Sequence, residues 1–117
     1  MSAAAIKPQV PLEALEALDI RLGTIVRVEE VPKSTRLVRL IVDFGDHERR
    51  ILAGLKQERA DPGAIAGRQC LFVVNLPPRT IMGEESQGML FDIGHADGLV
   101  PCLALPERAM PNGARAG

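Results

Sequence analysis

Short apolar stretches with a period of two, separated by glycine and proline, constrain this fold more than any other feature of the sequence. Between Ile20 and Glu29, apolar and polar residues alternate, which predicts a half-buried strand. One face of that strand would carry Ile20, Leu22, Thr24, Val26 and Val28. Residues 38–44 repeat the alternation, and Gly45-Asp46 predicts a turn into a third strand over residues 48–55.

The rest of the chain predicts further short strands. Residues 60–67 contain proline and two glycines and predict a helix of one or two turns. The apolar run 69–76 predicts a strand buried on both faces, and short strands are expected on either side of "HADG". Such strands must close or pack on a second sheet to protect their edges. The order favours an all-β, five-stranded Greek-key OB barrel, with a split β-sandwich as the alternative.

A short helix is expected ahead of the barrel. Pro11 can open a helix over "LEALEAL", in which Leu12, Leu15 and Leu18 form one apolar stripe. That stripe would cover either the end of the barrel itself or an interface with a second copy. Residues 1–10 are expected to be flexible and residues 11–117 to form a single domain. No signal peptide or membrane span is predicted, which favours a cytoplasmic protein without membrane insertion.

The polar loop "NLPPRTIMGEESQGML" does not carry a convincing catalytic pattern. Ser86 lies in G-x-x-S-x-G, one residue longer than a nucleophile elbow. His47 and His95 lie in polar turn segments, where exposed histidines are expected, and Glu84 and Glu85 would point to opposite sides of an extended segment. We therefore expect no catalytic residues and no enzymatic activity.

The same loop has the chemistry of a binding surface. Pro77-Pro78 restricts the directions in which Arg79 can point. Ser86 and Gln87 offer a hydroxyl and an amide suited to phosphate or sugar oxygens, and Asn75 lies at the strand end. The alternative is that Asn75 and Ser86 only cap the loop's own backbone, as short polar side chains do routinely.

Charge and aromatic content decide which nucleic acid would suit such a surface. The net charge is −1, but residues 21–60 carry nine Lys/Arg against six Asp/Glu, a local charge of +3. This excess could form a phosphate-binding face or simply belong to solvated strand faces. Phe44, Phe72 and Phe91 all lie in strand patterns and are expected in the core. Structured RNA, read through phosphates, is therefore favoured over single strands that need stacking platforms.

Two cysteines, Cys70 and Cys102, provide neither a disulfide framework nor a metal-ligand spacing. No cofactor and no metal site are expected.

Three separated motifs resemble one known family. "LDIRLGTIVRVEEVP", "VVNLPPRTIMGEESQGML" and "MPNG" are similar to the tRNA-binding domain of free-standing bacterial tRNA-binding proteins and of the C-terminal extension of methionyl-tRNA synthetases. The resemblance covers roughly residues 12–115 and is greatest to the CsaA-type branch of export-related chaperones. It implies an OB-fold, a homodimer, and recognition of tRNA by shape without catalysis.

The resemblance also implies which residues bind. The family pattern N-x-x-P-R-x-x-x-G-x-x-S-Q-G-M is occupied by Asn75, Arg79, Gly83, Ser86, Gln87, Gly88 and Met89, of which Met89 is expected in the core. Where other members carry basic residues, this chain has Pro77, Thr80 and Met82, with the acidic Glu84 nearby. Fewer phosphate contacts predict weaker binding with a smaller dependence on salt.

Two functions are therefore predicted from the sequence. The first is a non-catalytic, homodimeric tRNA-binding protein that uses Asn75, Arg79, Ser86 and Gln87, together with Lys33 and Arg36 from the connection between the first two strands. The alternative is a chaperone that binds unfolded or export-bound polypeptides. Its support is the lost basic residues and three apolar residues expected to be exposed, Ile25, Ile81 and Met82.

Overall fold

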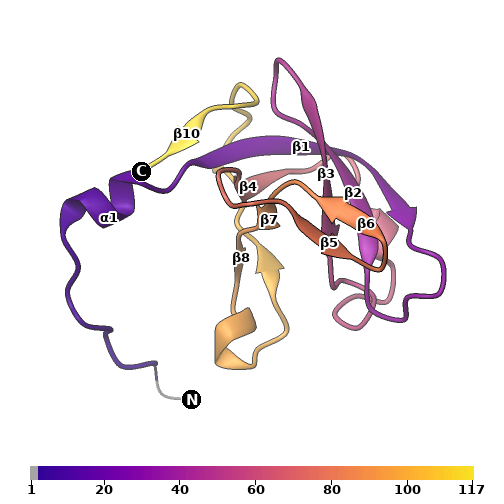
Figure 1. Cartoon of the computed structure of the whole chain (residues 1–117), viewed down its shortest axis with the longest axis horizontal. Helices are drawn as coiled ribbons and strands as arrows, with labels where there is room; N and C mark the ends of the chain where they lie inside the picture. The colour runs from indigo at the N-terminus through magenta and orange to yellow at the C-terminus, as the bar shows by residue number, and fades with distance from the viewer. Residues whose placement is uncertain (1–2) are drawn as a thin grey trace.

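The computed structural model describes residues 3–117, which form a curled antiparallel sheet with short helical turns (Figure 1). The main sheet has the order β3 (Glu48–Ala53), β2 (Val38–Asp43), β1 (Ile20–Glu30), β4 (Gln69–Val73) and β7 (Met89–Leu90), with β10 (Arg115–Ala116) paired to the start of β1. Two small ribbons join β5 (Arg79–Ile81) to β6 (Glu84–Ser86) and β8 (Asp92–Ile93) to β9 (Cys102–Leu103). The helical elements are α1 (Leu12–Glu16) and the 3-10 turns η1 (Pro62–Ile65) and η2 (His95–Asp97).

The prediction of a mostly-β, OB-like fold is confirmed. The β2–β3 hairpin forms through the expected Gly45-Asp46 turn, and Val38, Leu40, Val42 and Phe44 are all buried. The segment between β3 and β4 forms η1, which contributes the buried Ile65 to the core. Because one face of β2 is apolar throughout, its period-two pattern was sufficient to identify its inner face.

The prediction for β1 is wrong in its second half. The alternation changes after Thr24, so that Ile25 is fully buried and Val26 is 42% exposed. The cause is a β-bulge, because the register with β2 shifts between Ile25 and Arg27. At Ile25 the pairing of β1 with β4 has ended. The Ile25 N–H donates to the carbonyl of Arg68, and the Ile25 carbonyl accepts from the N–H of Gly67. Ile25 therefore belongs to the core and not to an exposed apolar surface.

Two other core predictions fail for a related reason. Met89 is 47% exposed and Phe91 is 43% exposed. Leu90 pairs with Phe72 of β4 and packs on the core, so its two chain neighbours point outward by strand alternation. Strand β4 also departs from the prediction, since Leu71 on its second face is only partly buried.

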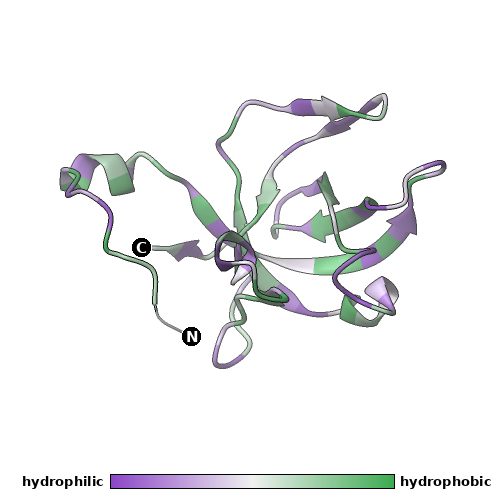
Figure 2. Ribbon diagram, turned by 90° about the horizontal axis from the view of Figure 1, so that it is seen from below, coloured by the Kyte–Doolittle hydropathy of each residue, from purple (hydrophilic) through white to green (hydrophobic). Residues whose placement is uncertain are grey.

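Helix α1 forms where it was predicted but covers no part of the barrel. Leu12, Leu15 and Leu18 are 64%, 52% and 45% exposed, and no residue of α1 is buried. Figures 1 and 2 show α1 standing apart from the barrel, beyond the start of β1. The helix does not plug the end of its own barrel. Within residues 3–117, no helix is long and apolar enough to span a membrane.

The "MPNG" turn fastens the C-terminal segment across β1 and β4. The Asn112 Oδ1 atom accepts hydrogen bonds from Thr24 Oγ1 and Gln69 Nε2, both at 2.9 Å. The Gly113 N–H donates to the carbonyl of Leu22 over 2.7 Å, just before β10 pairs with β1. The motif thus has a structural role in closing the sheet.

Candidate nucleic-acid interface

The polar segment after β4, predicted as a loop, contains the regular hairpin β5–β6. Arg79 pairs with Ser86 and Ile81 with Glu84, and the turn falls at Met82 and Gly83. Both turn residues have positive φ, 54° and 79°, as a type I′ turn requires. On the inner side, Ile81 packs against a small cluster of Val31, Leu37 and Leu52. This packing holds the hairpin in place, and Met82 lies exposed at its tip.

Ser86 and Gln87 hold this hairpin against β3. Ser86 is 5% exposed, and its hydroxyl accepts from the Leu52 N–H at 3.0 Å and donates to the Gly88 carbonyl at 3.1 Å. Gln87 pairs with Arg50 in both directions, through its backbone N–H at 2.8 Å and its side-chain Oε1 at 2.9 Å. These side chains bond to the backbone of a distant strand, and not to their own loop alone.

We expect Ser86→Ala to lower the free energy of unfolding by about 1–3 kcal/mol, because it leaves the buried Leu52 N–H without its acceptor. Chemical denaturation measures the change. The matched control is Thr80→Ala on the exposed hairpin surface, expected to fall within about 0.5 kcal/mol of wild type. Equal stability of the two variants would show that the Ser86 hydroxyl does not anchor the hairpin.

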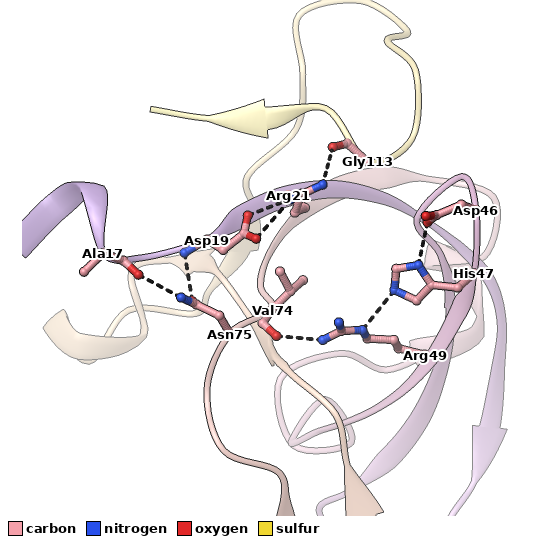
Figure 3. Close-up of polar contacts among 9 residues, drawn as sticks. All are labelled: Ala17, Asp19, Arg21, Asp46, His47, Arg49, Val74, Asn75 and Gly113. Carbon is pink, nitrogen blue, oxygen red and sulfur yellow. Dashed lines mark hydrogen bonds and ion pairs between the residues drawn. The ribbon is translucent and has the colours of Figure 1, made fainter.

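Arg49 closes the base of the hairpin segment, a role that the sequence did not reveal. Its Nη1 donates to the carbonyls of Val74 at 2.6 Å and Gln87 at 3.1 Å, on the two sides of the segment (Figure 3 shows the first). Its Nε donates to Nε2 of His47, whose Nδ1 lies 2.6 Å from Asp46 Oδ1. Hydrogen bonding to His47 lowers the pKa of the Asp46 carboxyl.

Asn75 ties the start of the same segment to the connection between α1 and β1. Its Oδ1 accepts from the Asp19 N–H at 2.8 Å, and its Nδ2 donates to the Ala17 carbonyl at 2.7 Å (Figure 3). Asp19 in turn accepts two hydrogen bonds from Arg21, which lower the pKa of its carboxyl. Asn75 thus fixes the direction in which the chain leaves α1.

Glu84 does not present a free carboxylate beside the hairpin. Arg39 Nε donates to Glu84 Oε1 over 2.6 Å, and the other side of the same guanidinium lies 3.2 Å from Glu29. The bond to Glu84, followed by that to Glu29, raises the pKa of Arg39. The negative charge of Glu84 is therefore neutralised by an ion pair that joins β6 to β2.

Two of the predicted site arginines meet at a groove. Arg36 and Arg79 are exposed and line a groove of about 530 Å³ between the end of β3, strand β7 and η2. Within residues 3–117, neither side chain has a hydrogen bond or an ion pair. Lys33 is exposed in the β1–β2 connection, at a φ of 68°, but does not line the groove. The structure therefore brings Arg36 and Arg79 together and leaves Lys33 apart.

The groove also contains residues that the sequence did not assign to a site. Exposed Phe91 and Met89 line it, as do Asp92 and His95. Among residues 3–117 no group of three His, Cys, Asp or Glu side chains is arranged to hold a metal ion. Cys70 is buried, which raises the pKa of its thiol to about 12, and Cys102 is exposed; both are free thiols.

Comparison with known proteins places this geometry in a family. Residues 20–115 match the family model described as a putative tRNA binding domain. The chain is 41% identical over 96 residues to a methionine–tRNA ligase from Porphyromonas gingivalis, which covers 82% of this chain and 14% of the enzyme. It is 35% identical over 109 residues to the corresponding enzyme from Archaeoglobus fulgidus, which covers 93% of this chain and 16% of that enzyme. The chain thus spans only a small part of these relatives.

Solved structures agree with this assignment. The crystal structure of a MetRS-related protein from Pyrococcus horikoshii matches with a TM-score of 0.85 and 31% identity, over 95% of this chain and all of that one. The crystal structure of chaperone CsaA from Bacillus anthracis matches with a TM-score of 0.80 and 29% identity, over 94% of this chain and all of that one. The chain belongs to the tRNA-binding domain family.

Proposed function

We propose that this protein is a non-catalytic, homodimeric tRNA-binding protein that recognises its ligand by shape. The observation that carries the proposal is the pair of exposed arginines, Arg36 and Arg79, on one groove of a tRNA-binding domain. Their guanidinium groups have no partner within residues 3–117, so they are available to phosphate oxygens. Contacts of this kind position a nucleic acid without reading its sequence.

The six proposed site residues divide into two roles. Arg36, Arg79 and Lys33 would contact phosphates from the groove and from the β1–β2 connection. Asn75, Ser86 and Gln87 would act through the hairpin, because their hydrogen bonds to Asp19, Leu52 and Arg50 determine where Arg79 is held. The buried Ser86 hydroxyl, which donates to a backbone carbonyl, is not presented as a nucleophile. This arrangement supports binding without catalysis.

The proposed dimer follows from the uncovered apolar stripe of α1. Leu12, Leu15 and Leu18 are all more than two-fifths exposed, and exposed Leu105 and Met110 add apolar surface in the C-terminal segment. Burying such side chains against a second copy would be favourable. In a dimer, two weakly basic faces could also contact one large RNA at the same time, and the high effective concentration of the second face would strengthen binding.

We expect Leu15→Asp to convert a dimer into a monomer, because a carboxylate would be forced into the apolar interface. Sedimentation velocity at micromolar concentration measures the change. Ala14→Asp is the matched control, since it adds the same charge to an exposed position of α1 outside the stripe, and it should remain dimeric. A wild-type monomer under these conditions would remove the dimer from the proposal.

A polypeptide-binding chaperone is the second candidate function. It is supported by the exposed apolar side chains of Met82, Met89 and Phe91, on and beside the hairpin. It is weakened by two of the residues first assigned to an apolar surface, since Ile25 is buried in the core and Ile81 packs on the cluster beneath the hairpin. The unpaired arginines of the groove favour an anionic ligand, and RNA binding therefore remains the leading proposal.

A further inference from the structure

The groove beside the hairpin has an aromatic surface in addition to its two arginines. Phe91 is 43% exposed, and its backbone N–H donates to the Leu71 carbonyl at 3.0 Å, which holds the residue along the edge of β4. Phe91 lines the same groove as Arg36 and Arg79. A groove lined by an exposed aromatic residue and by two arginines offers the two kinds of group on which unpaired nucleotides bind, a stacking surface and phosphate donors.

We propose that this groove holds one unpaired nucleotide of the bound RNA, with its base on the Phe91 ring and its phosphates on Arg36 and Arg79. The inference rests on the proposed function and adds a contact that reading of paired RNA by shape does not need. A groove of about 530 Å³ falls within the range of sites that hold small organic ligands. Exposed Met89 is a second apolar residue that lines the groove.

The remaining charges of the groove fix how the nucleotide would lie. Glu58, Asp92 and Asp97 also line it, and Glu58 Oε1 lies 3.7 Å from His95 Nδ1. Carboxylates repel phosphate, so the phosphates belong on the arginines and the base edge lies toward the acids. Carboxylate oxygens accept hydrogen bonds from exocyclic amino groups, which adenine, cytosine and guanine carry and uracil lacks. The groove should therefore bind uridine less well than the other three nucleosides.

The test compares Phe91→Leu with wild type on two RNAs, bulk tRNA and a fully paired blunt RNA duplex, each at two salt concentrations. Leucine keeps an apolar side chain but removes the ring, and melting temperatures confirm folding. We expect tRNA affinity to fall by about fivefold or more with an unchanged salt slope, because stacking is not electrostatic, while duplex affinity stays the same. The control Ile93→Ala removes an exposed apolar residue that does not line the groove and should bind tRNA as wild type does.

A second readout does not depend on any variant. Amide shifts of Phe91 and Gly94 are followed by NMR during titration with AMP and with UMP, and we expect larger shifts at lower concentration with AMP. If the wild type binds tRNA and Phe91→Leu binds it equally well, this inference is overturned while the proposed function stands. The same holds if Phe91→Leu loses affinity for tRNA and for the duplex to an equal extent. If Phe91→Leu lost affinity for an unfolded polypeptide but kept its affinity for tRNA, the inference would be overturned and the groove would be a peptide-binding site. No wild-type binding of tRNA would overturn both.

Discussion

Gly113→Ala should lower the free energy of unfolding by about 3 kcal/mol, the largest stability change expected from a single methyl group in this chain. Gly113 has a φ of 89°, and a Cβ at this position would lie 2.4 Å from the backbone carbonyl oxygen of Phe44. Neither atom belongs to a flexible side chain, so the backbone itself must move. The movement would strain the bond from the Gly113 N–H to the Leu22 carbonyl, which closes the C-terminal segment onto β1.

The control separates the contact from the backbone conformation. Gly98 has a φ of 70°, but a Cβ there would meet no atom within 4 Å. Gly98→Ala should therefore lose only about 1–2 kcal/mol, the cost of a left-handed conformation for a residue with a side chain. Denaturant titration of both variants measures the difference. If Gly113→Ala were no less stable than Gly98→Ala, the close approach of the "MPNG" turn to Phe44 would not constrain the fold.

Replacing both groove arginines, in Arg36→Ala with Arg79→Ala, should reduce tRNA affinity by about a hundredfold at low salt. A hydrogen bond to a charged group contributes about 1.5–3 kcal/mol, and each arginine would supply at least one to phosphate. The slope of log affinity against log salt should also become shallower by about 1.4–1.8. Filter binding or fluorescence titration at several salt concentrations measures both quantities.

Two comparisons show whether this loss is specific. Because phosphates carry no sequence information, different tRNAs should lose affinity to a similar extent, and a large loss for one tRNA only would contradict reading by shape. Arg68→Ala with Arg108→Ala is the control, since it removes two exposed charges that do not line the groove. An equal loss in that control would assign the effect to overall charge and not to this site.

The buried face of a strand could be predicted from the sequence where the residue pattern of that strand alone decides which face is buried. Strand β2 follows its period of two from Val38 to Val42 because its partners are its neighbours in the chain. Strand β1 does not, since its bulge depends on hydrogen bonds from Ile25 to Gly67 and Arg68, about forty residues away. The apolar side chains of Met89 and Phe91 predict burial in the core. The sequence does not predict that β7 is only two residues long, with Phe91 beyond its end.

The candidate site could be predicted only in part. The motif drew attention to the hairpin segment and Arg79, and the barrel order predicted Lys33 and Arg36 on the same face. Arg36 lines the groove with Arg79, whereas Lys33 does not. The hydrogen bonds of Asn75 and Ser86 could not be foreseen, because their partners Ala17, Asp19 and Leu52 are 34 to 58 residues away in the chain. Arg49 and Phe91 gave no signal in the sequence, since an arginine in a strand and a phenylalanine between apolar residues are ordinary features of β-sheets.

Binding of tRNA by this protein can be measured by titrating the wild type with bulk tRNA at low and at near-physiological salt. We expect saturable binding that weakens as salt rises, with a slope that reflects a small number of phosphate contacts. The same protein, titrated with a permanently unfolded polypeptide, should bind far more weakly than it binds tRNA. Absence of tRNA binding at low salt, together with saturable binding of the polypeptide, would show that the protein binds polypeptides as a chaperone and not tRNA.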